Sequence, residues 1–265
     1  MFLNLDSLHT VVVNLSSEDS NKKQSGLNRA IHAQVLTWLQ KGNPEVSALI
    51  HHSQRSPISL SELIKKTDSP ITKSGNFQET NRLSFKVNLL QGYLLPILLK
   101  GIETETEISL ANYKFTLIGV DSLPSANSHA RLTSYKELVE HSKPCDVIKF
   151  ELLSPTSFKQ NNCIQPFPLP ELVFNNLLRR WNTFAPIEYH FPKVEWQGMT
   201  AAYDLKTKVI KKEVNEIGSV GWVKYAFKNE EQARIATALA TFANFSGIGR
   251  KTALGMGQVE FKPKI

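Results

Sequence analysis

The stretch Gly247-Ile-Gly-Arg-Lys-Thr-Ala-Leu-Gly-Met-Gly257 places four glycines and two adjacent cations in one turn near the end of the 265-residue chain. It follows a helical pattern and precedes the apparent last strand. Glycine permits positive φ and brings backbone N–H groups close to a ligand, while lysine and arginine attract a phosphate chain. The sequence therefore predicts an anion cradle made by Gly247, Gly249, Arg250, Lys251, Gly255 and Gly257.

A flexible loop is the alternative interpretation of this stretch. Linkers scatter glycine among serine and proline, whereas these glycines follow the regular pattern G-h-G-x5-G-x-G, with h apolar. A Walker loop needs Gly-x4-Gly-Lys-Ser/Thr at the start of a helix, and a Rossmann fingerprint must follow a first strand. This loop follows a helix instead, so it belongs to neither class.

The elements that precede the loop form a repeated order. Apolar residues at alternating or helical spacing predict, in the second half, a strand over 147–153, a helix over 170–183, a hairpin over 202–214 and 220–227, a helix after Asn229 and a strand over 258–262. The same reasoning predicts, in the first half, a strand over 8–15, helices over 26–41 and 45–51, a strand over 82–90, a helix over 92–99 and a strand over 112–120. Two α+β units with the order βαββαβ fit this pattern best.

The joint between the two units is predicted around residues 121–142. Residues 121–131 are rich in Ser, Asn and Pro, and a helix over 135–141 follows them. We therefore expect an N-terminal domain over residues 1–142 and a C-terminal domain over residues 143–265.

Charge and cysteine content limit the classes of function. There are 31 Lys and Arg against 24 Asp and Glu, which gives a net charge of +7 and a pI near 9.3, and this suits a polyanionic partner. Cys145 and Cys163 form no CxxC pair, and no histidine lies near them at zinc-finger spacing. No signal peptide or long apolar run is visible, so the sequence predicts a soluble, cytoplasmic protein.

Four further stretches carry a family resemblance: Phe150-Glu-Leu-Leu-Ser-Pro-Thr-Ser-Phe158, Leu177-Leu-Arg-Arg-Trp-Asn182, Gly221-Trp-Val-Lys224 and Phe242-Ala-Asn-Phe-Ser-Gly-Ile-Gly249. With the glycine-rich loop, they resemble the endoribonucleases of the repeat-associated (RAMP) RNA-binding superfamily, which cut CRISPR precursor RNA at its repeats. The resemblance implies tandem ferredoxin-like domains, no cofactor and CRISPR repeat RNA as the partner. It leaves subunits of a CRISPR effector complex as further partners.

RNA can be cleaved without a metal or a protein nucleophile, because its 2′-hydroxyl can attack the adjacent phosphorus. The enzyme then supplies a base, an acid and cations for the developing charge. Two regions cluster histidine with cations: Arg29 with His32, and His51 with Arg55. Arg29 and His32 are i, i+3 neighbours off the apolar stripe of their helix, so both can face a cleft. An ordinary polar helix face is the alternative.

The resemblance assigns roles to these residues. It implies that His51 is the catalytic histidine and that His32 occupies the position of a second proton-transfer residue. Relatives often have a lysine just beyond the histidine, where this chain has Arg55, which can stabilise phosphorane charge but is a very weak acid. The predicted catalytic set is His51, His32, Arg29 and Arg55, and the predicted products carry a 5′-hydroxyl and a 2′,3′-cyclic phosphate. No DxD or ExxE cluster adjoins a histidine, which argues against a two-metal nuclease.

Further basic residues are candidates for RNA contact. Lys206 and Lys208 interrupt a hairpin strand, where they can follow an RNA backbone or protect a sheet edge from pairing. Arg179 and Arg180 are adjacent on a helix, so one can pack beside Trp181 while the other reaches phosphate.

Two other functions remain open from the sequence. A non-catalytic RNA-binding subunit of a CRISPR surveillance complex would need the glycine-rich loop but not the histidines. A nucleotide-binding enzyme of ferredoxin-like fold would have no affinity for a repeat hairpin.

Overall fold

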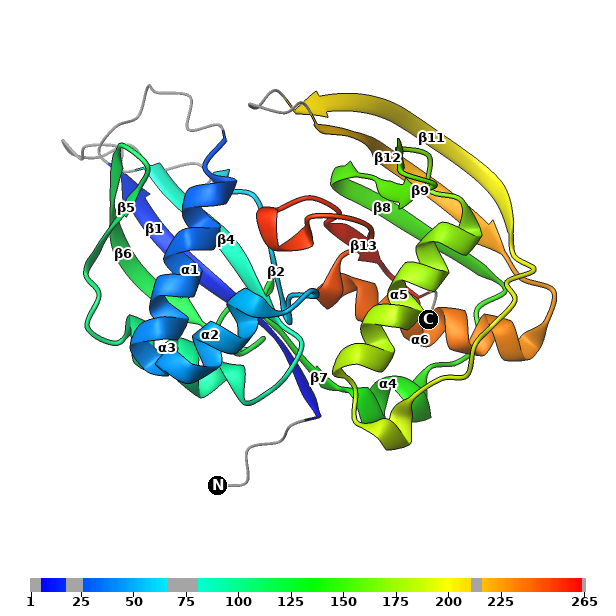
Figure 1. The fold of residues 1–265 in the computed structure, drawn as a ribbon, viewed down its shortest axis with the longest axis horizontal. Helices are drawn as coiled ribbons and strands as arrows, with labels where there is room; N and C mark the ends of the chain where they lie inside the picture. Colours follow the sequence, from blue (N-terminus) through cyan, green and yellow to red (C-terminus); the bar gives the residue numbers. More distant parts are fainter. Residues whose placement is uncertain (1–5, 18–25, 66–80, 211–215, 264–265) are drawn as a thin grey trace, which may run out of the picture.

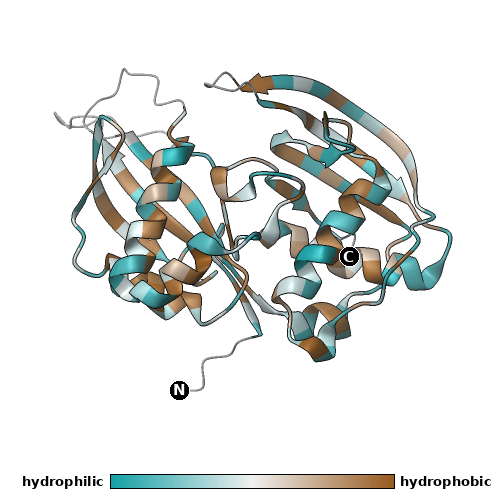
Figure 2. Ribbon diagram, in the orientation of Figure 1, coloured by the Kyte–Doolittle hydropathy of each residue, from teal (hydrophilic) through white to brown (hydrophobic). Residues whose placement is uncertain are grey.

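The chain folds into two α+β units that lie side by side, each with helices packed on an antiparallel sheet (Figure 1). The computed structural model describes residues 6–17, 26–65, 81–210 and 216–263. Apolar and polar residues alternate along the strands of both sheets (Figure 2). This alternation buries one face of each sheet under its helices.

The first sheet is built around β1 (Ser7–Ser17), which pairs with β4 (Asn81–Leu89) on one side and β6 (Tyr113–Asp121) on the other. The strand order is β2-β4-β1-β6-β5, with β3 paired to β4 and β7 paired to β1. The shorter strands are β2 (Ile58–Leu60), β3 (Ile64–Lys65), β5 (Glu107–Leu110) and β7 (Arg131–Ser134). Strands β2, β4, β1 and β6 have the arrangement of a βαββαβ unit.

Odd-numbered residues of the two central strands form the first core. Val11 and Phe85 are fully buried with Trp38 of the first helix, and the rings of Trp38 and Phe85 stack at 6.3 Å. The helices of this unit are α1 (Asn28–Gly42), α2 (Pro44–His52) and α3 (Leu94–Ile102). Helical spacing of apolar residues on α1 thus matches the alternation on the sheet below it.

The second sheet has the order β11-β12-β8-β13, which is the same βαββαβ arrangement. Its strands are β8 (Val147–Thr156), β11 (Met199–Ile210), β12 (Glu216–Ala226) and β13 (Val259–Phe261). Its helices are α5 (Pro170–Phe184), α6 (Glu230–Ser246) and two short 3-10 turns, η1 (Ile187–Tyr189) and η2 (Thr252–Leu254). The Asn229 side chain accepts from the backbone N–H of Gln232 at 2.9 Å, which confirms the predicted start of α6.

The tandem ferredoxin-like fold expected from the sequence is confirmed, and the differences lie in short or exposed strands. The sequence analysis missed β2, β3, β5, β7 and the hairpin of β9 (Phe158–Gln160) and β10 (Cys163–Gln165). Strands of two to four residues are too short to show an alternating pattern. The β11–β12 hairpin strands also begin earlier than predicted, because their first residues are not regularly apolar.

Helix α4 (Tyr135–His141) lies at the joint between the two units. Tyr135 and Leu138 are part of the second core, and the Tyr135 hydroxyl donates to the carbonyl oxygen of Leu90 at 3.0 Å. Strand β7, immediately before α4, still belongs to the first sheet. The division into residues 1–142 and 143–265 stays a proposal, and we propose α4 as its joint.

A buried chain of polar groups joins the first sheet to the end of α6. The Thr10 hydroxyl donates to Asn88 at 2.7 Å, the Asn88 amide donates to the Ser59 hydroxyl at 2.9 Å, and Ser59 donates to the carbonyl oxygen of Phe245 at 2.6 Å. Buried polar groups are costly unless paired, so this chain specifies one relative placement of the two units. None of the helices in the described part of the chain is long and apolar enough to cross a membrane.

Candidate functional site

The glycine-rich loop connects α6 to β13 at the boundary between the two units (Figure 1). All four glycines have positive φ, from 64° at Gly247 to 79° at Gly255. A Cβ on Gly249 would lie 2.3 Å from the Ser157 carbonyl oxygen, and one on Gly257 would lie 1.9 Å from that of Ile248. The loop therefore needs glycine both for its backbone angles and for its close packing.

The N–H groups of these glycines bind acceptors of the protein itself. Gly249 donates to the Asn176 side chain at 2.8 Å, and Gly257 donates to the Pro155 carbonyl at 3.0 Å. Gly247 and Gly255 donate to carbonyl oxygens within α6 and η2. The sequence analysis expected such N–H groups to face a ligand, but in the structure they hold the loop in place. The glycine N–H groups are therefore engaged within the protein, and the loop presents its shape and its two cations instead.

Arg250 and Lys251 of the loop share a buried carboxylate. Glu216, at the start of β12, pairs with Arg250 at 3.4 Å and also with Lys251. Lys251 has a positive φ of 56°, a conformation that non-glycine residues rarely adopt. One carboxylate neutralises only part of the charge of two cations, so this end of the loop stays positive.

The loop also fixes the start of helix α1. The Asn28 side chain donates to the carbonyl oxygen of Leu254 at 3.0 Å. Arg29 follows in the first turn of α1, where it is exposed, and His32 lies one turn further and is half-buried. The predicted i, i+3 pair on α1 is therefore close to the glycine-rich loop.

Helix α2 positions the second histidine. The Asn43 side chain accepts from the N–H groups of Glu45 and Val46, and Pro44 occupies the first turn, so α2 begins sharply after α1. Ile50 packs inward, which leaves His51 exposed in the last turn. Because α1 and α2 are joined by the single residue Asn43, the two helices that carry the histidines form a compact corner.

An electrostatic interaction links the two predicted histidines, His32 and His51. Burial lowers the pKa of His32 below its ordinary value of 6.5, and the nearby His51 imidazole lowers it further. The His52 ring contacts His51 edge-on, with centroids 5.6 Å apart, and is exposed. The arrangement provides two imidazoles that interact electrostatically, and one of them, His32, is biased towards its neutral form.

Arg55 connects this corner to the second unit. Its guanidinium donates to the Thr183 hydroxyl of α5 at 2.9 Å. The chain from His51 to Arg55 is four residues long, so the two Cα atoms lie within about 15 Å of each other.

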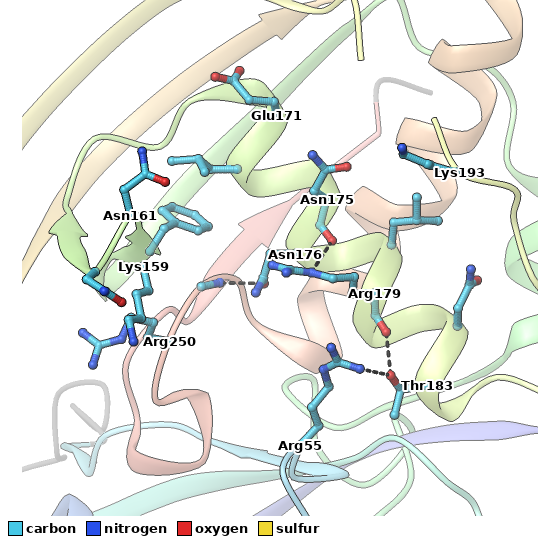
Figure 3. A pocket seen from close by; sticks show the side chains of 16 residues that line it. Arg55, Lys159, Asn161, Glu171, Asn175, Asn176, Arg179, Thr183, Lys193 and Arg250 are labelled. Carbon is cyan, nitrogen blue, oxygen red and sulfur yellow. Dashed lines mark hydrogen bonds between the residues drawn. The ribbon is translucent and has the colours of Figure 1, made fainter. Parts of the chain in front are cut away.

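Arg55 also lines a pocket of about 1060 Å³ between the two units, shown in Figure 3. The pocket is bordered by α5, the β9–β10 hairpin and the glycine-rich loop. Its lining carries five cations: Arg55, Lys159, Arg179, Lys193 and Arg250. Among the described residues that line it, Glu171 is the one carboxylate. A pocket with this charge attracts a polyanion rather than a neutral or cationic ligand.

Several lining residues were not identified from the sequence. Lys159, Asn161 and Asn162 belong to the β9–β10 hairpin, and Asn161 and Asn162 both have positive φ. Two asparagines between short strands indicate a tight hairpin turn, and this pattern at Asn161-Asn162 could have been recognised. Lys193 and Asn175 carry no local pattern, since only the fold brings them to the same pocket.

The adjacent arginines of α5 have different environments. Arg179 is exposed and lines the pocket, with its Nε donating to the Asn175 carbonyl at 3.2 Å. Arg180 is buried and donates to the Ser246 carbonyl at 2.7 Å, the Thr252 hydroxyl at 2.5 Å and the Ser56 carbonyl at 3.3 Å. Burial lowers the pKa of Arg180 to about 10. Arg179 is thus placed to reach a ligand, whereas Arg180 joins three protein segments.

The predicted lysines on the hairpin lie apart from this pocket. Lys206 and Lys208 are exposed on β11, the edge strand of the second sheet, and neither lines the pocket. Lys211 and Lys212, on the same predicted strand, lie outside the described residues. Within the described part of the chain, no three His, Cys, Asp or Glu side chains are grouped as metal ligands. Cys145 and Cys163 are free thiols.

The fold of this chain is similar to that of several solved structures. The chain shares its fold with a structure titled "An RAMP protein binding different RNA substrates", which it matches with a TM-score of 0.63 and 16% identity, covering 96% of this chain and 100% of that one. A Thermus thermophilus Cas6 (TTHB231) in a product complex matches with a TM-score of 0.79 and 22% identity, over 97% of this chain and 100% of that one. Another Cas6 product complex (TTHA0078) matches with a TM-score of 0.72 and 24% identity, over the same fractions.

A family model matches part of the sequence. Residues 150–259 match the family described as CRISPR-associated endoribonuclease Cas6. No curated protein matches the chain. The resemblance to CRISPR repeat-processing endoribonucleases that the sequence analysis predicted is confirmed. The matched region contains the glycine-rich loop and α5, while the two histidines lie before it.

We expect Arg180→Ala to destabilise the protein and Arg179→Ala to leave its stability nearly unchanged. Removing the Arg180 guanidinium leaves buried acceptors unpaired and opens a cavity, at about 2–4 kcal/mol in free energy of unfolding. An exposed substitution such as Arg179→Ala changes that free energy by about 0.5 kcal/mol or less. Urea denaturation of both variants measures the difference. Equal stabilities would show that Arg180 does not hold the junction together.

We also expect His32 to titrate below 6.5 in an NMR titration of the imidazole protons. His51→Gln should raise the pKa of His32 only partly, because burial is the larger cause. Since the lowered pKa means that the unfolded chain binds the proton more tightly, the stability contributed by His32 is present above pH 6.5 and is lost as the pH falls through the lowered pKa. A His32 pKa that does not respond to His51→Gln would show that the two rings are not neighbours.

Proposed function

We propose that this protein is an endoribonuclease that cuts CRISPR repeat RNA within the precursor transcript by metal-independent transesterification. The 2′-hydroxyl attacks the adjacent phosphorus, the bond to the 5′-oxygen breaks, and the products carry a 2′,3′-cyclic phosphate and a 5′-hydroxyl. The observation that carries the proposal is the interacting His32–His51 pair together with Arg55, which follows His51 by four residues and lines a pocket with four other cations. An imidazole pair supplies both proton transfers that this reaction needs.

The environments of the two histidines suggest how they divide the work. The lowered pKa of His32 favours the neutral imidazole, which can accept the 2′-hydroxyl proton. His51 is exposed, so its imidazole can reach the leaving 5′-oxygen and give it a proton. We therefore assign His32 as the base and His51 as the acid.

Arg29 and Arg55 provide the charge that the reaction requires. Both lie next to the histidines in the chain, and the planar guanidinium can bind two phosphate oxygens at once. Arg55 is held by Thr183, so its guanidinium is already oriented before RNA binds. Arginine stays protonated throughout, and its role is electrostatic stabilisation of the phosphorane rather than proton donation.

The basic pocket and the glycine-rich loop provide the RNA-binding surface. Arg179, Lys159, Lys193 and Arg250 line the pocket and can contact successive phosphates. Gly247, Gly249, Gly255 and Gly257 shape the loop that carries Arg250 and Lys251. Lys206 and Lys208 on the exposed edge strand can contact the backbone of a duplex that extends beyond the pocket.

The biological substrate is inferred from the comparisons. The family matched by residues 150–259 consists of CRISPR-associated endoribonucleases, and two of the similar structures are titled as Cas6 product complexes. We propose repeat RNA as the partner on this ground, with effector-complex subunits as a further partner. A non-catalytic guide-holding subunit would bind the same RNA but would leave it intact.

The chemical test uses a repeat RNA with a single 2′-deoxy ribose before the cut. We expect no cleavage at that bond and nearly unchanged binding, because the attacking group is gone while one hydrogen bond among many phosphate contacts is worth only about 1 kcal/mol. Cleavage of the unmodified RNA should continue in EDTA. Cleavage of the deoxy RNA at the same bond would show that water or a protein group attacks instead.

His51→Ala should abolish cleavage and leave repeat binding within a few fold. General acid or base catalysis is worth about 10² to 10⁴ in rate, and the imidazole acts on protons that move in the transition state. Single-turnover rates at saturating protein measure the loss. His52→Ala is the matched control, since its ring is adjacent and exposed, and it should cleave at a rate near that of the unmodified protein. An equal loss of cleavage rate in both variants would contradict a catalytic role that belongs to His51 alone.

A further inference from the structure

The helix-free face of the second sheet carries a tryptophan that the fold does not explain. On β12, Val223 and Tyr225 point to the helices and are fully buried. Trp222 and Lys224 alternate with them and therefore lie on the opposite face. The Gly221-Trp-Val-Lys224 stretch was part of the family resemblance, but the cleavage site does not use it.

Trp222 differs from the other tryptophans in its surroundings. Of the four tryptophans, Trp38 and Trp181 are fully buried in the two cores, and Trp196 packs against the second core and binds Asn175. Trp222 is part of neither core and remains partly exposed. A large aromatic ring on an open sheet face adds little to folding, so its position needs another explanation.

Two lysine ammonium groups approach the Trp222 ring. Lys149 Nζ lies 5.0 Å from the ring centroid and Lys224 Nζ lies 5.5 Å from it. Lys149 is on β8 and pairs directly with Lys224 in the sheet, so the two cations adjoin the ring from neighbouring strands. An aromatic ring between cations matches the two parts of a nucleotide, a flat base and a charged phosphate.

The positive charge extends over this face in both directions. Lys206 and Lys208 on β11 lie on the same face as Trp222, because Asp204 pairs with Trp222 in the sheet and the intervening Leu205 packs towards the core. At the β13 side, Arg131 of the first unit pairs with Glu260 at 3.2 Å. Three carboxylates lie on this face. Glu151 pairs with Lys149, and Glu260 pairs with Arg131 and Lys262. Asp204 lies opposite Trp222 in the sheet. Cations outnumber carboxylates across the face.

We propose that the helix-free face of the second sheet binds a single-stranded part of the RNA, with one base stacked on Trp222 and Lys149 and Lys224 on the flanking phosphates. The proposal rests on the proposed function, since it adds a second site for the same transcript. Bases in a duplex are stacked on each other and cannot lie on a protein ring, so this face selects unpaired RNA. The pocket that Arg55 lines, by contrast, has no exposed aromatic ring among its described lining residues.

The experiment measures binding of a short unstructured RNA and of a repeat hairpin without flanking nucleotides. Trp222→Ala should weaken binding of the unstructured RNA about tenfold, because loss of one stacked base is worth about that factor. Trp222→Phe should retain affinity within about threefold, since a phenyl ring still stacks. Binding of the bare hairpin, and its cleavage, should be unchanged in both variants.

A second measurement works in the unmodified protein. An abasic site at one position of the unstructured RNA should weaken its binding to the unmodified protein. The same abasic site should not weaken binding to the Trp222→Ala variant further, because the stacking of that base on the Trp222 ring is already lost. The intrinsic fluorescence of Trp222 should also be quenched on binding, and Trp196→Phe is the control that retains this quenching. Equal affinity of the unmodified protein and Trp222→Ala for the unstructured RNA, or an abasic effect that is the same in both, would overturn the proposal. Failure of the unmodified protein to cleave the hairpin would instead contradict the proposed function.

Discussion

The buried guanidinium of Arg180 is the interaction on which the geometry of the site depends. It donates at once to the end of α6, to η2 in the glycine-rich loop and to Ser56, the residue after Arg55. Among the described residues Arg180 has no carboxylate partner and is held by neutral acceptors, and burial lowers its pKa to about 10. Such a group is tolerated only when all three acceptors stay in place. The loop, the α5 surface and the segment of the histidines are thereby set relative to one another.

This junction explains why the glycine-rich loop is close-packed rather than open. Its glycine N–H groups donate hydrogen bonds to the Asn176 side chain, the Pro155 carbonyl and neighbouring carbonyls. The shape of the loop depends on close contacts that a Cβ would block. The loop thus contributes rigidity and two cations, while the open space for a ligand lies beside it, between α5 and the β9–β10 hairpin. Pre-organised cations lose little side-chain entropy when a phosphate binds, which favours affinity. The helix-free sheet face offers a second, chemically different surface for unpaired nucleotides.

Much of the fold could be predicted because the spacing of apolar residues along a long segment indicates whether it is a helix or a strand. Helix α1 and strands β1 and β4 were predicted close to their observed bounds, since the apolar stripe of α1 and the alternation on the strands match one core. Strands β2 and β5 were missed because so few residues show no period, although β2 carries Ser59, which joins the two units. The Arg179–Arg180 pair had two interpretations in the sequence. Only burial shows that Arg180 belongs to the junction and Arg179 to the pocket.

The sequence by itself determined the tandem βαββαβ order, the basic character and the types of residue that could carry proton transfer. These properties depend on local spacing and composition, which the chain displays without being folded. Tertiary structure alone decided which residues meet. His32 and His51 become neighbours because α1 and α2 turn sharply at Asn43, and Lys193 joins Arg55 and Arg250 because segments distant in sequence surround one pocket. Contacts of this kind depend on packing between elements, and no local pattern in the chain encodes the distance between two side chains that lie on different elements.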